Sequence, residues 1–249
     1  MRNHLLICAA LAAPAWADEL DWRPPFITTP PQVVERMLEM AGTRPDDLVI
    51  DLGSGDGRIV IAAAQKFGAR ALGIELDRAL VQKSRANAIG AKVAERATFV
   101  EGDVLAADIS RATVVTVYLL PALMGKLQAR FIGELAPGTR IVSHEFTMAG
   151  WLPDRSETVR LKARHSGQGD ESRLHLWIVP AQVRGTWRGT GPEAGMTLRI
   201  EQSYQRIEVE GARAATLSGR DISWDNFKGR VEGNRIVGEL AGRPVEFKR

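Results

Sequence analysis

The sequence predicts an α/β protein with a doubly wound, mostly parallel seven-stranded sheet, followed by a small antiparallel β domain. Two observations lead to this prediction. Up to about Pro180 apolar strand-like segments alternate with helix-like ones, whereas from Gln182 onward helical periodicity is absent. A chain of 249 residues with 45% hydrophobic and 25% charged residues is long enough for a medium domain plus a small one.

The first seventeen residues differ from the rest of the chain. Arg2 is followed by the apolar run LLICAALAA, and the small-x-small pattern Ala15-Trp16-Ala17 stands before Asp18. This pattern is typical of a cleavable secretory signal peptide. Because the apolar run is well short of the roughly 20 residues of a transmembrane helix, we expect export, to the periplasm, without a membrane span. A hydrophobic helix packed on the domain is the alternative.

We therefore assign residues 1–17 to the signal peptide, 18–180 to the α/β domain and 181–249 to the β domain. The first helix of the α/β domain is predicted in TTPPQVVERMLEMAG, where Thr29 is placed to cap the helix and prolines stand at its start. Its apolar residues recur at helical spacing: Val33, Val34, Met37, Leu38 and Ala41.

Strand-like and helix-like segments then alternate along the chain. Strands are predicted at 47–52, 70–75, 97–101, 113–119 and 139–146. Helices are predicted at 57–67, 78–89 and 121–135. Such alternation is typical of parallel strands with helices on both faces. Two later runs, TVRLKAR and LHLWIVP, have only a polar loop between them, so we expect an antiparallel hairpin at one edge of the sheet.

Beyond Gln182 apolar and polar residues alternate, and glycine or asparagine stands at short turns. This pattern predicts an antiparallel meander that forms a small open barrel or curled sheet. Turns and bulges are expected at three glycines, Gly229, Gly233 and Gly238. Three aromatic residues are expected in the core rather than on a contact surface, namely Trp187, Trp224 and Phe227.

Charge and composition exclude several classes of function. The net charge is +3, but basic and acidic residues are interspersed, so we expect no nucleic-acid partner. The only cysteine, Cys8, lies in the predicted signal peptide, so no disulfide is expected. The histidines do not have the spacing of metal ligands, and we expect no metal site.

The stretch VIDLGSGDGRIVIAAA joins a predicted buried strand to a helix through Gly53, Gly55 and Gly57. Ligands of α/β sheets bind at this place, at the carboxyl ends of the strands. Glycine lets the backbone turn tightly and approach a ligand without a Cβ in the way. The three glycines therefore predict a ligand-binding loop.

Spacing and charge favour one ligand for this loop. A dinucleotide site has the pattern G-x-G-x-x-G, but here Arg58 stands where the last small residue belongs. Asp51 and Asp56 would repel a pyrophosphate and favour a ligand with positive charge. S-adenosylmethionine (SAM) carries a sulfonium and an ammonium, so we expect it as the cofactor.

Two further carboxylates stand at strand ends. Glu75 ends the second strand in LGIELD, where an acid can accept hydrogen bonds from both ribose hydroxyls. Asp103 ends the third strand in VEGDVL and is placed to receive the adenine amino group. Taken alone, each acid has an equally good alternative interpretation as a solvated strand-end residue or a helix cap. Together, at successive strand ends, they favour a SAM site.

The segments VIDLGSGDG, GIELD and EGDVL resemble the successive cofactor motifs of class I, seven-strand SAM-dependent methyltransferases. Within that class, PFITTPPQVVERML, VTVYLLP and SHEFTMAGW are similar to segments of the ATP synthase c-subunit lysine methyltransferase-like group. The resemblance covers residues 26–180. It implies a SAM-dependent methyltransferase with a lysine or another amine as acceptor.

The resemblance also implies roles for single residues. Phe26 and Thr28 match an N-terminal segment that closes over the cofactor, the alternative being an arm packed on the sheet. The complete set of residues that it assigns to SAM is Phe26, Thr28, Asp51, Gly53, Gly55, Gly57, Glu75 and Asp103.

The fourth strand ends in Tyr118, where class I enzymes place groups that face the acceptor. The NPPY signature of enzymes that methylate amide and base amino groups is absent from the chain. Since a protonated amine must be aligned and must lose a proton, the catalytic candidates are Tyr118, His144 and Glu145. For His144 and Glu145 the alternative is a hydrogen-bonded pair at a strand end, and Trp151 is expected in the core.

Two classes of function remain open. The first is a SAM-dependent methyltransferase acting on an amine, such as a protein lysine, or on another acceptor. The second is an exported, non-catalytic protein that binds a nucleoside or a partner on the same scaffold. The cofactor motifs favour the enzyme. The absent NPPY signature and the signal peptide favour the binding protein. Because SAM is made in the cytosol, a cytoplasmic location is the alternative to export.

Overall fold

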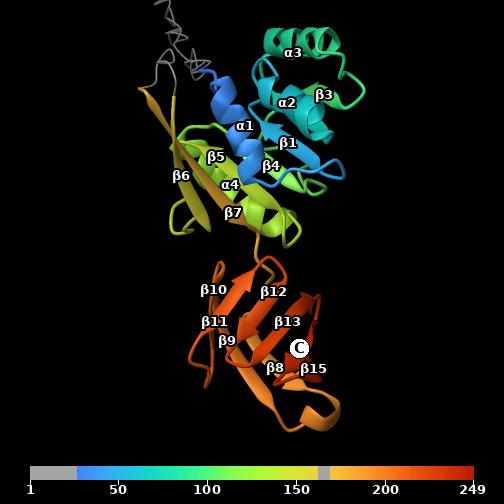
Figure 1. Ribbon diagram of the computed structural model, residues 1–249, viewed down its shortest axis with the longest axis vertical. Helices are drawn as coiled ribbons and strands as arrows, with labels where there is room; N and C mark the ends of the chain where they lie inside the picture. Colours follow the sequence, from blue (N-terminus) through green and yellow to red (C-terminus); the bar gives the residue numbers. More distant parts are fainter. Residues whose placement is uncertain (1–26, 162–168) are drawn as a thin grey trace, which may run out of the picture.

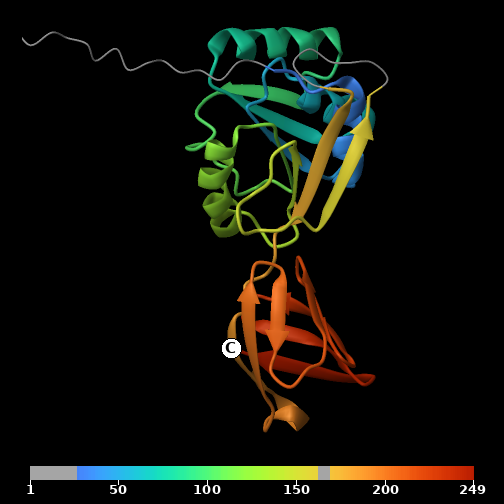
Figure 2. The same ribbon diagram turned by 90° about the vertical axis from the view of Figure 1, so that its left-hand side faces the viewer.

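The computed structural model describes residues 27–161 and 169–249, which form two units arranged one above the other (Figure 1). Figure 2, turned by 90°, shows the same separation of an upper α/β unit from a lower unit made of strands. The predicted signal peptide, Phe26 and the end of the TVRLKAR run lie outside the described residues. They stay predictions, as do the predicted domain boundaries. Within the described ranges, none of the helices combines the length and apolar character of a membrane span.

Strands and helices alternate in the upper unit. Its helices are α1 (Pro31–Met40), α2 (Arg58–Phe67), α3 (Arg78–Gly90) and α4 (Pro121–Glu134). Its strands are β1 (Leu48–Leu52), β2 (Arg70–Glu75), β3 (Ala97–Glu101), β4 (Val114–Val117), β5 (Arg140–His144), β6 (Arg155–Arg160) and β7 (Glu171–Ile178). The order in the sheet is β3-β2-β1-β4-β5-β7-β6. Strands β1 to β5 pair in parallel, and β7 is antiparallel to β5 and β6, so the predicted fold class and edge hairpin are confirmed.

Helices cover both faces of this sheet. Buried side chains of α1, α2 and α3 form one hydrophobic cluster with the strands, and those of α4 form another. Neighbouring residues of a strand point to opposite faces, so Val49 belongs to the first cluster and Ile50 to the second. The sheet is therefore buried on both faces, as a parallel sheet requires.

The apolar face predicted for α1 is buried, with Val33 and Met37 fully covered. The predicted helix cap is wrong. Pro30 is the residue before the helix, and no side chain caps it. The hydroxyl of Thr29 instead lies 3.2 Å from Nδ1 of His144, so it joins the start of α1 to the end of β5.

The lower unit is an eight-stranded antiparallel sheet. Its strands are β8 (Gly185–Gly189), β9 (Thr197–Ser203), β10 (Arg206–Val209), β11 (Ala215–Ser218), β12 (Asp221–Trp224), β13 (Phe227–Glu232), β14 (Arg235–Leu240) and β15 (Arg243–Lys248), with a short 3-10 helix η1 (Gly191–Glu193). The order is β10-β9-β8-β15-β14-β13-β12-β11. Strand β15, the last in the chain, pairs with β8, the first strand of this unit, so the sheet is curled. Its two end strands, β10 and β11, follow one another in the chain and are connected by residues 210–214. We call this unit the barrel.

The interior of the barrel is aromatic, as predicted. Trp187 and Phe227 are fully buried and Trp224 is 7% exposed, which confirms their assignment to the core. Gly233 lies in the β13–β14 turn with a φ of +61°. Gly229 and Gly238 do not lie at turns. They face each other inside β13 and β14, where the Phe227 ring and strand backbone occupy the space of a Cβ atom.

Candidate active site

The glycine loop leaves β1 and enters α2 at the carboxyl end of the parallel strands. Gly53, Gly55 and Gly57 have φ angles of +78°, +55° and +83°, a region that other residues avoid. A Cβ atom at Gly57 would lie 2.6 Å from Cζ of Phe99, and one at Gly53 would lie 2.8 Å from Cδ2 of Leu119. The loop conformation therefore requires glycine for both backbone geometry and space.

Glu75 holds this loop against the end of β2. Its Oε2 accepts a hydrogen bond of 2.8 Å from the Gly55 N–H, and its Oε1 accepts one of 2.9 Å from the Asp77 N–H. The N–H groups of Gly53 and Ser54 both donate to the carbonyl of Ile74. The acid predicted at the second strand end thus lies next to the glycine loop.

Asp103 follows β3 at the same edge of the sheet. Glu75 and Glu101 stand opposite each other in β2 and β3, and the Gly102 N–H donates to the Glu75 carbonyl. The exposed carboxylate of Asp103 accepts a hydrogen bond of 2.8 Å from the Leu105 N–H. The structure therefore brings the three strand-end acids predicted from the sequence to one edge.

Leu76 lies at the same strand end and was not among the residues predicted from the sequence. It directly follows Glu75, and 62% of its surface is exposed. An exposed apolar side chain between polar ligand-binding residues offers a surface on which a flat base can pack. The sequence alone does not indicate that Leu76 is exposed, because a leucine after an apolar strand can equally well be buried.

Asp56 forms an ion pair within the glycine loop region. Arg58 donates hydrogen bonds of 2.9 and 2.7 Å to its two carboxylate oxygens and holds the pKa of Asp56 below its usual range. Arg58 also donates to the carbonyl of Thr29. Asp56 therefore stays ionised and has its charge partly compensated by Arg58, and its effect on a ligand stays a prediction.

Asp51 is the buried acid of the site. It is 2% exposed, and its Oδ1 accepts a hydrogen bond of 2.7 Å from the Thr116 hydroxyl on β4. Burial raises the pKa of Asp51 to about 7, and the carboxylates of Glu75 and Asp56 act in the same direction. The hydrogen bond from Thr116 opposes this shift only in part.

The raised pKa of Asp51 makes the stability of the ligand-free chain depend on pH. Between about 4 and 7 the folded chain keeps a proton that the unfolded chain releases, so the free energy of unfolding should fall as the pH rises, by at most about 1.4 kcal/mol per pH unit. Asp51→Asn should flatten this dependence in urea unfolding measured from pH 4.5 to 8. Exposed Asp46→Asn is the control, and equal pH slopes for Asp51→Asn and the unchanged chain would contradict the prediction.

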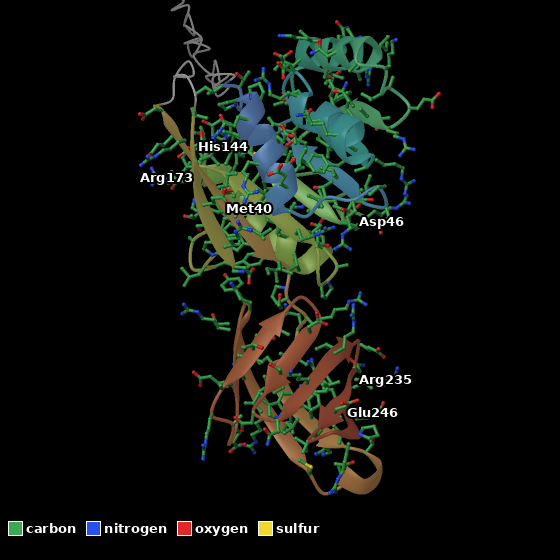
Figure 3. All side chains as sticks on the ribbon, viewed as in Figure 1. Met40, Asp46, His144, Arg173, Arg235 and Glu246 are labelled. Atoms are coloured by element: carbon green, nitrogen blue, oxygen red, sulfur yellow. The ribbon has the colours of Figure 1, made fainter. Side chains whose placement is uncertain are left out.

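The three catalytic candidates meet at the ends of β4 and β5. The rings of Tyr118 and His144 have centroids 4.2 Å apart, and Nε2 of His144 lies 3.6 Å from Oε1 of Glu145. The Phe146 ring stacks on Tyr118 at 6.2 Å and 18°. Figure 3 labels His144 in the upper unit, away from the barrel. Thr28 is half-buried and directly precedes Thr29, whose hydroxyl contacts His144.

Glu145 has a strained backbone that β7 holds in place. Its φ angle is +68°, which is unfavourable for a residue with a side chain. The Glu145 N–H donates to the Arg173 carbonyl at 2.8 Å, and its Oε1 accepts from the Arg173 N–H at 2.9 Å. Strain of this kind, fixed by neighbouring contacts, is typical of functional positions.

Burial separates the three candidates. His144 has no exposed surface, whereas the Glu145 side chain is 21% exposed and Tyr118 is half-buried. Among the described residues, His, Cys, Asp and Glu side chains form no group of three or more that could hold a metal ion. The arrangement provides a carboxylate and aromatic rings at its surface, and a buried histidine behind them.

Comparison with known proteins decides between the two classes of function. Residues 51–155 match the family model of the ANTKMT methyltransferase domain. The chain is 46% identical over 130 residues to a protein-lysine N-methyltransferase of Saccharolobus islandicus, a match that covers 52% of this chain and 81% of that protein. The chain belongs to this methyltransferase family. The family-model match ends before the barrel begins.

The methyltransferase is also 35% identical over 130 residues to the ATP synthase c-subunit lysine N-methyltransferase of Xenopus laevis. This match covers 52% of the chain and 57% of that relative, so the chain spans little more than half of the relative's length. A crystal structure of an RNA methyltransferase from Salinibacter ruber in complex with S-adenosyl-L-homocysteine has 48% sequence identity and a TM-score of 0.57. That comparison covers 63% of this chain and 96% of the other.

These comparisons confirm a class I SAM-dependent methyltransferase, and therefore the enzyme rather than the non-catalytic binding protein. They also confirm SAM as the cofactor, because S-adenosyl-L-homocysteine is what remains of SAM after methyl transfer. The roles of the individual site residues and the location of the protein stay predictions.

Proposed function

We propose that this methyltransferase transfers the methyl group of SAM to the side-chain amine of a protein lysine. The proposal rests on the group of Tyr118, His144 and Glu145 at the ends of β4 and β5. Aromatic rings and a carboxylate lie together there. Aromatic faces and a carboxylate both attract an ammonium group. The names of the relatives from Saccharolobus islandicus and Xenopus laevis, which are lysine methyltransferases, support the same acceptor.

The described residues carry charges that fit SAM. The glycine loop carries no side chains at positions 53, 55 and 57, and buried Asp51 is the acid that would meet the ammonium of the methionine part. Glu75 would accept from the ribose hydroxyls and Asp103 from the adenine amino group. Exposed Leu76 would pack against the base. When bound, SAM supplies a methyl carbon activated by its sulfonium.

The acceptor amine must reach the site with a free electron pair. A lysine side chain is protonated at neutral pH and must give up its proton before the nitrogen can attack the methyl carbon. Glu145 is placed to take this proton, because its carboxylate is accessible and its backbone is fixed by β7. Tyr118 would hold the amine beside Glu145 through its ring and hydroxyl.

His144 supports this arrangement from behind. It is fully buried between the Thr29 hydroxyl, the Tyr118 ring and the Glu145 carboxylate, so it reaches the acceptor only through its neighbours. Its contact with Thr29 ties the segment before α1 to the acceptor side of the site. We therefore assign His144 to the positioning of Tyr118 and Glu145.

The test is the transfer of tritium from methyl-labelled SAM to three acceptors. Poly-L-lysine should be labelled, whereas poly-L-arginine, which has the same charge but no primary amine, and transcribed RNA should not. Glu145→Gln should lower turnover on poly-L-lysine by about 100-fold or more and leave SAM affinity unchanged. The control is Glu95→Gln, an exposed acid on the α3–β3 connection. Labelling of RNA alone, the acceptor class in the name of the Salinibacter ruber relative, would contradict the proposal.

A further inference from the structure

The connection from β5 to β6, residues 145–154, contains no helix. Parallel strands are usually joined by a crossover helix that covers one face of the sheet. Here two side chains of the connection take that place, because Met148 is 4% exposed and Trp151 is fully buried. Both belong to the hydrophobic cluster on the α4 face, and the Trp151 carbonyl accepts a hydrogen bond from the indole N–H of Trp177. The connection therefore closes the core of the α/β unit.

A residue of the barrel completes this closure. Tyr204, in the turn between β9 and β10, stacks on Trp151 with a centroid distance of 5.3 Å and an angle of 4° between the rings. Its side chain packs against the cluster of the α4 face and not against the interior of the barrel. The neighbouring Gln205 donates a hydrogen bond of 2.6 Å to the carbonyl of Leu152.

Gln128 of α4 bridges the β9–β10 turn and the segment 145–154. Nε2 of Gln128 donates to the Tyr204 hydroxyl at 2.7 Å and to the Ala149 carbonyl at 2.9 Å. Tyr204 itself has a φ angle of +55°, and its carbonyl accepts a hydrogen bond of 2.8 Å from the side chain of Gln202. Tyr204 is the first residue of a two-residue hairpin turn, in which a positive φ angle is usual, and this turn carries the ring that stacks on Trp151.

The other end of the same connection carries acceptor-side residues. Glu145 begins it, and Phe146 stacks on Tyr118 while its carbonyl accepts a hydrogen bond from the Ser143 hydroxyl. The residues that would hold SAM lie instead at the ends of β1, β2 and β3, and β4 separates β1 from β5, the strand at which the connection begins. A loosened connection should therefore affect the acceptor side and spare the SAM side.

We propose that the barrel is a positioning element of the methyltransferase, in which Tyr204 holds residues 145–154 and thereby keeps Glu145 and Phe146 beside Tyr118. Tyr204 acts through Trp151 and Gln128, and we assign it no contact with SAM or with the acceptor. The expected loss of turnover rests on the proposed function, because the assay uses a lysine acceptor. The expected loosening of residues 145–154 does not depend on the acceptor.

The test compares three variants of the full chain by hydrogen exchange, SAM titration and turnover on poly-L-lysine. Tyr204→Ala should speed exchange of the amides at 146–152 and lower turnover by about 10-fold to 100-fold, with SAM affinity within about twofold of the unchanged chain. Tyr204→Phe keeps the ring on Trp151 and should restore most of the turnover. Met196→Ala removes an exposed apolar side chain that follows η1 in the chain, and should change none of the three.

Two results would overturn the proposal. One is unchanged exchange at 146–152 in Tyr204→Ala, and the other is faster exchange with full turnover. If Tyr204→Ala unfolds the barrel, Tyr204→Leu gives the answer instead, because it keeps a large apolar side chain in the turn and removes the ring that stacks on Trp151. Absence of methylation by the unchanged chain would count against the lysine acceptor, and the exchange measurement would still decide whether Tyr204 holds the connection.

Discussion

Gly57→Ala should remove detectable SAM binding and lower the free energy of unfolding by about 2–4 kcal/mol. Two costs combine at this position. The backbone φ of +83° is unfavourable for alanine, and the new Cβ would lie 2.6 Å from the Phe99 ring and 2.8 Å from Cβ of Ser84. Since both neighbours belong to the packed core, the loop must move instead. Urea unfolding and calorimetric titration with SAM measure the two effects.

The matched control for Gly57→Ala is Gly42→Ala. Gly42 has a φ of +61°, but within the described part of the chain no atom lies within 4 Å of the place where its Cβ would stand. The backbone cost alone should therefore remain, about 1 kcal/mol of stability, with unchanged SAM affinity. Equal losses of stability in the two variants would show that the contact with Phe99 does not determine the loss of stability in Gly57→Ala.

Glu75→Ala should weaken SAM binding by about 100-fold, corresponding to about 3 kcal/mol, because two hydrogen bonds from ribose hydroxyls to a carboxylate are lost. The structure adds a second effect. The carboxylate also accepts the N–H groups of Gly55 and Asp77, so the variant should lose about 1–2 kcal/mol of stability. Calorimetric titration and urea unfolding separate the two.

Glu75→Gln provides the comparison that isolates the ligand contact. It keeps the size of the side chain and one oxygen for the backbone N–H groups, but it loses the charge and one acceptor. Its affinity loss should exceed its stability loss. Exposed Glu95→Ala is the control and should change neither quantity. Wild-type SAM affinity in both Glu75 variants would show that the ribose contact is wrongly assigned.

Local patterns carried the predictions that the structure confirms. The alternation of apolar runs fixes which segments are strands, and parallel strands necessarily bring their carboxyl ends to one edge. Asp51, Glu75 and Asp103 therefore had to lie at the same edge of the sheet as the glycine loop once the strands were recognised. The positive φ angles of Gly53 and Gly57 follow from the same tight turn.

Contacts between distant segments were not accessible in this way. Thr29 has the residue type and position of a helix cap, and only the folded chain shows that its hydroxyl meets His144, which lies 115 residues away. Asp56 has the charge of a ligand acid, but Arg58 folds back onto it. Tyr204 stands in a β turn, and nothing in its neighbourhood along the chain indicates that its ring stacks on Trp151.

Calorimetric titration of SAM into the intact, folded chain tests the central claim most directly. We expect saturable binding of one SAM per chain, lost in Gly57→Ala, strongly weakened in Glu75→Gln and unchanged in Glu145→Gln. That pattern would place the cofactor on the glycine loop and the acid of β2, apart from the acceptor side. An absence of binding heat, with far-ultraviolet circular dichroism showing a folded chain, would contradict the account.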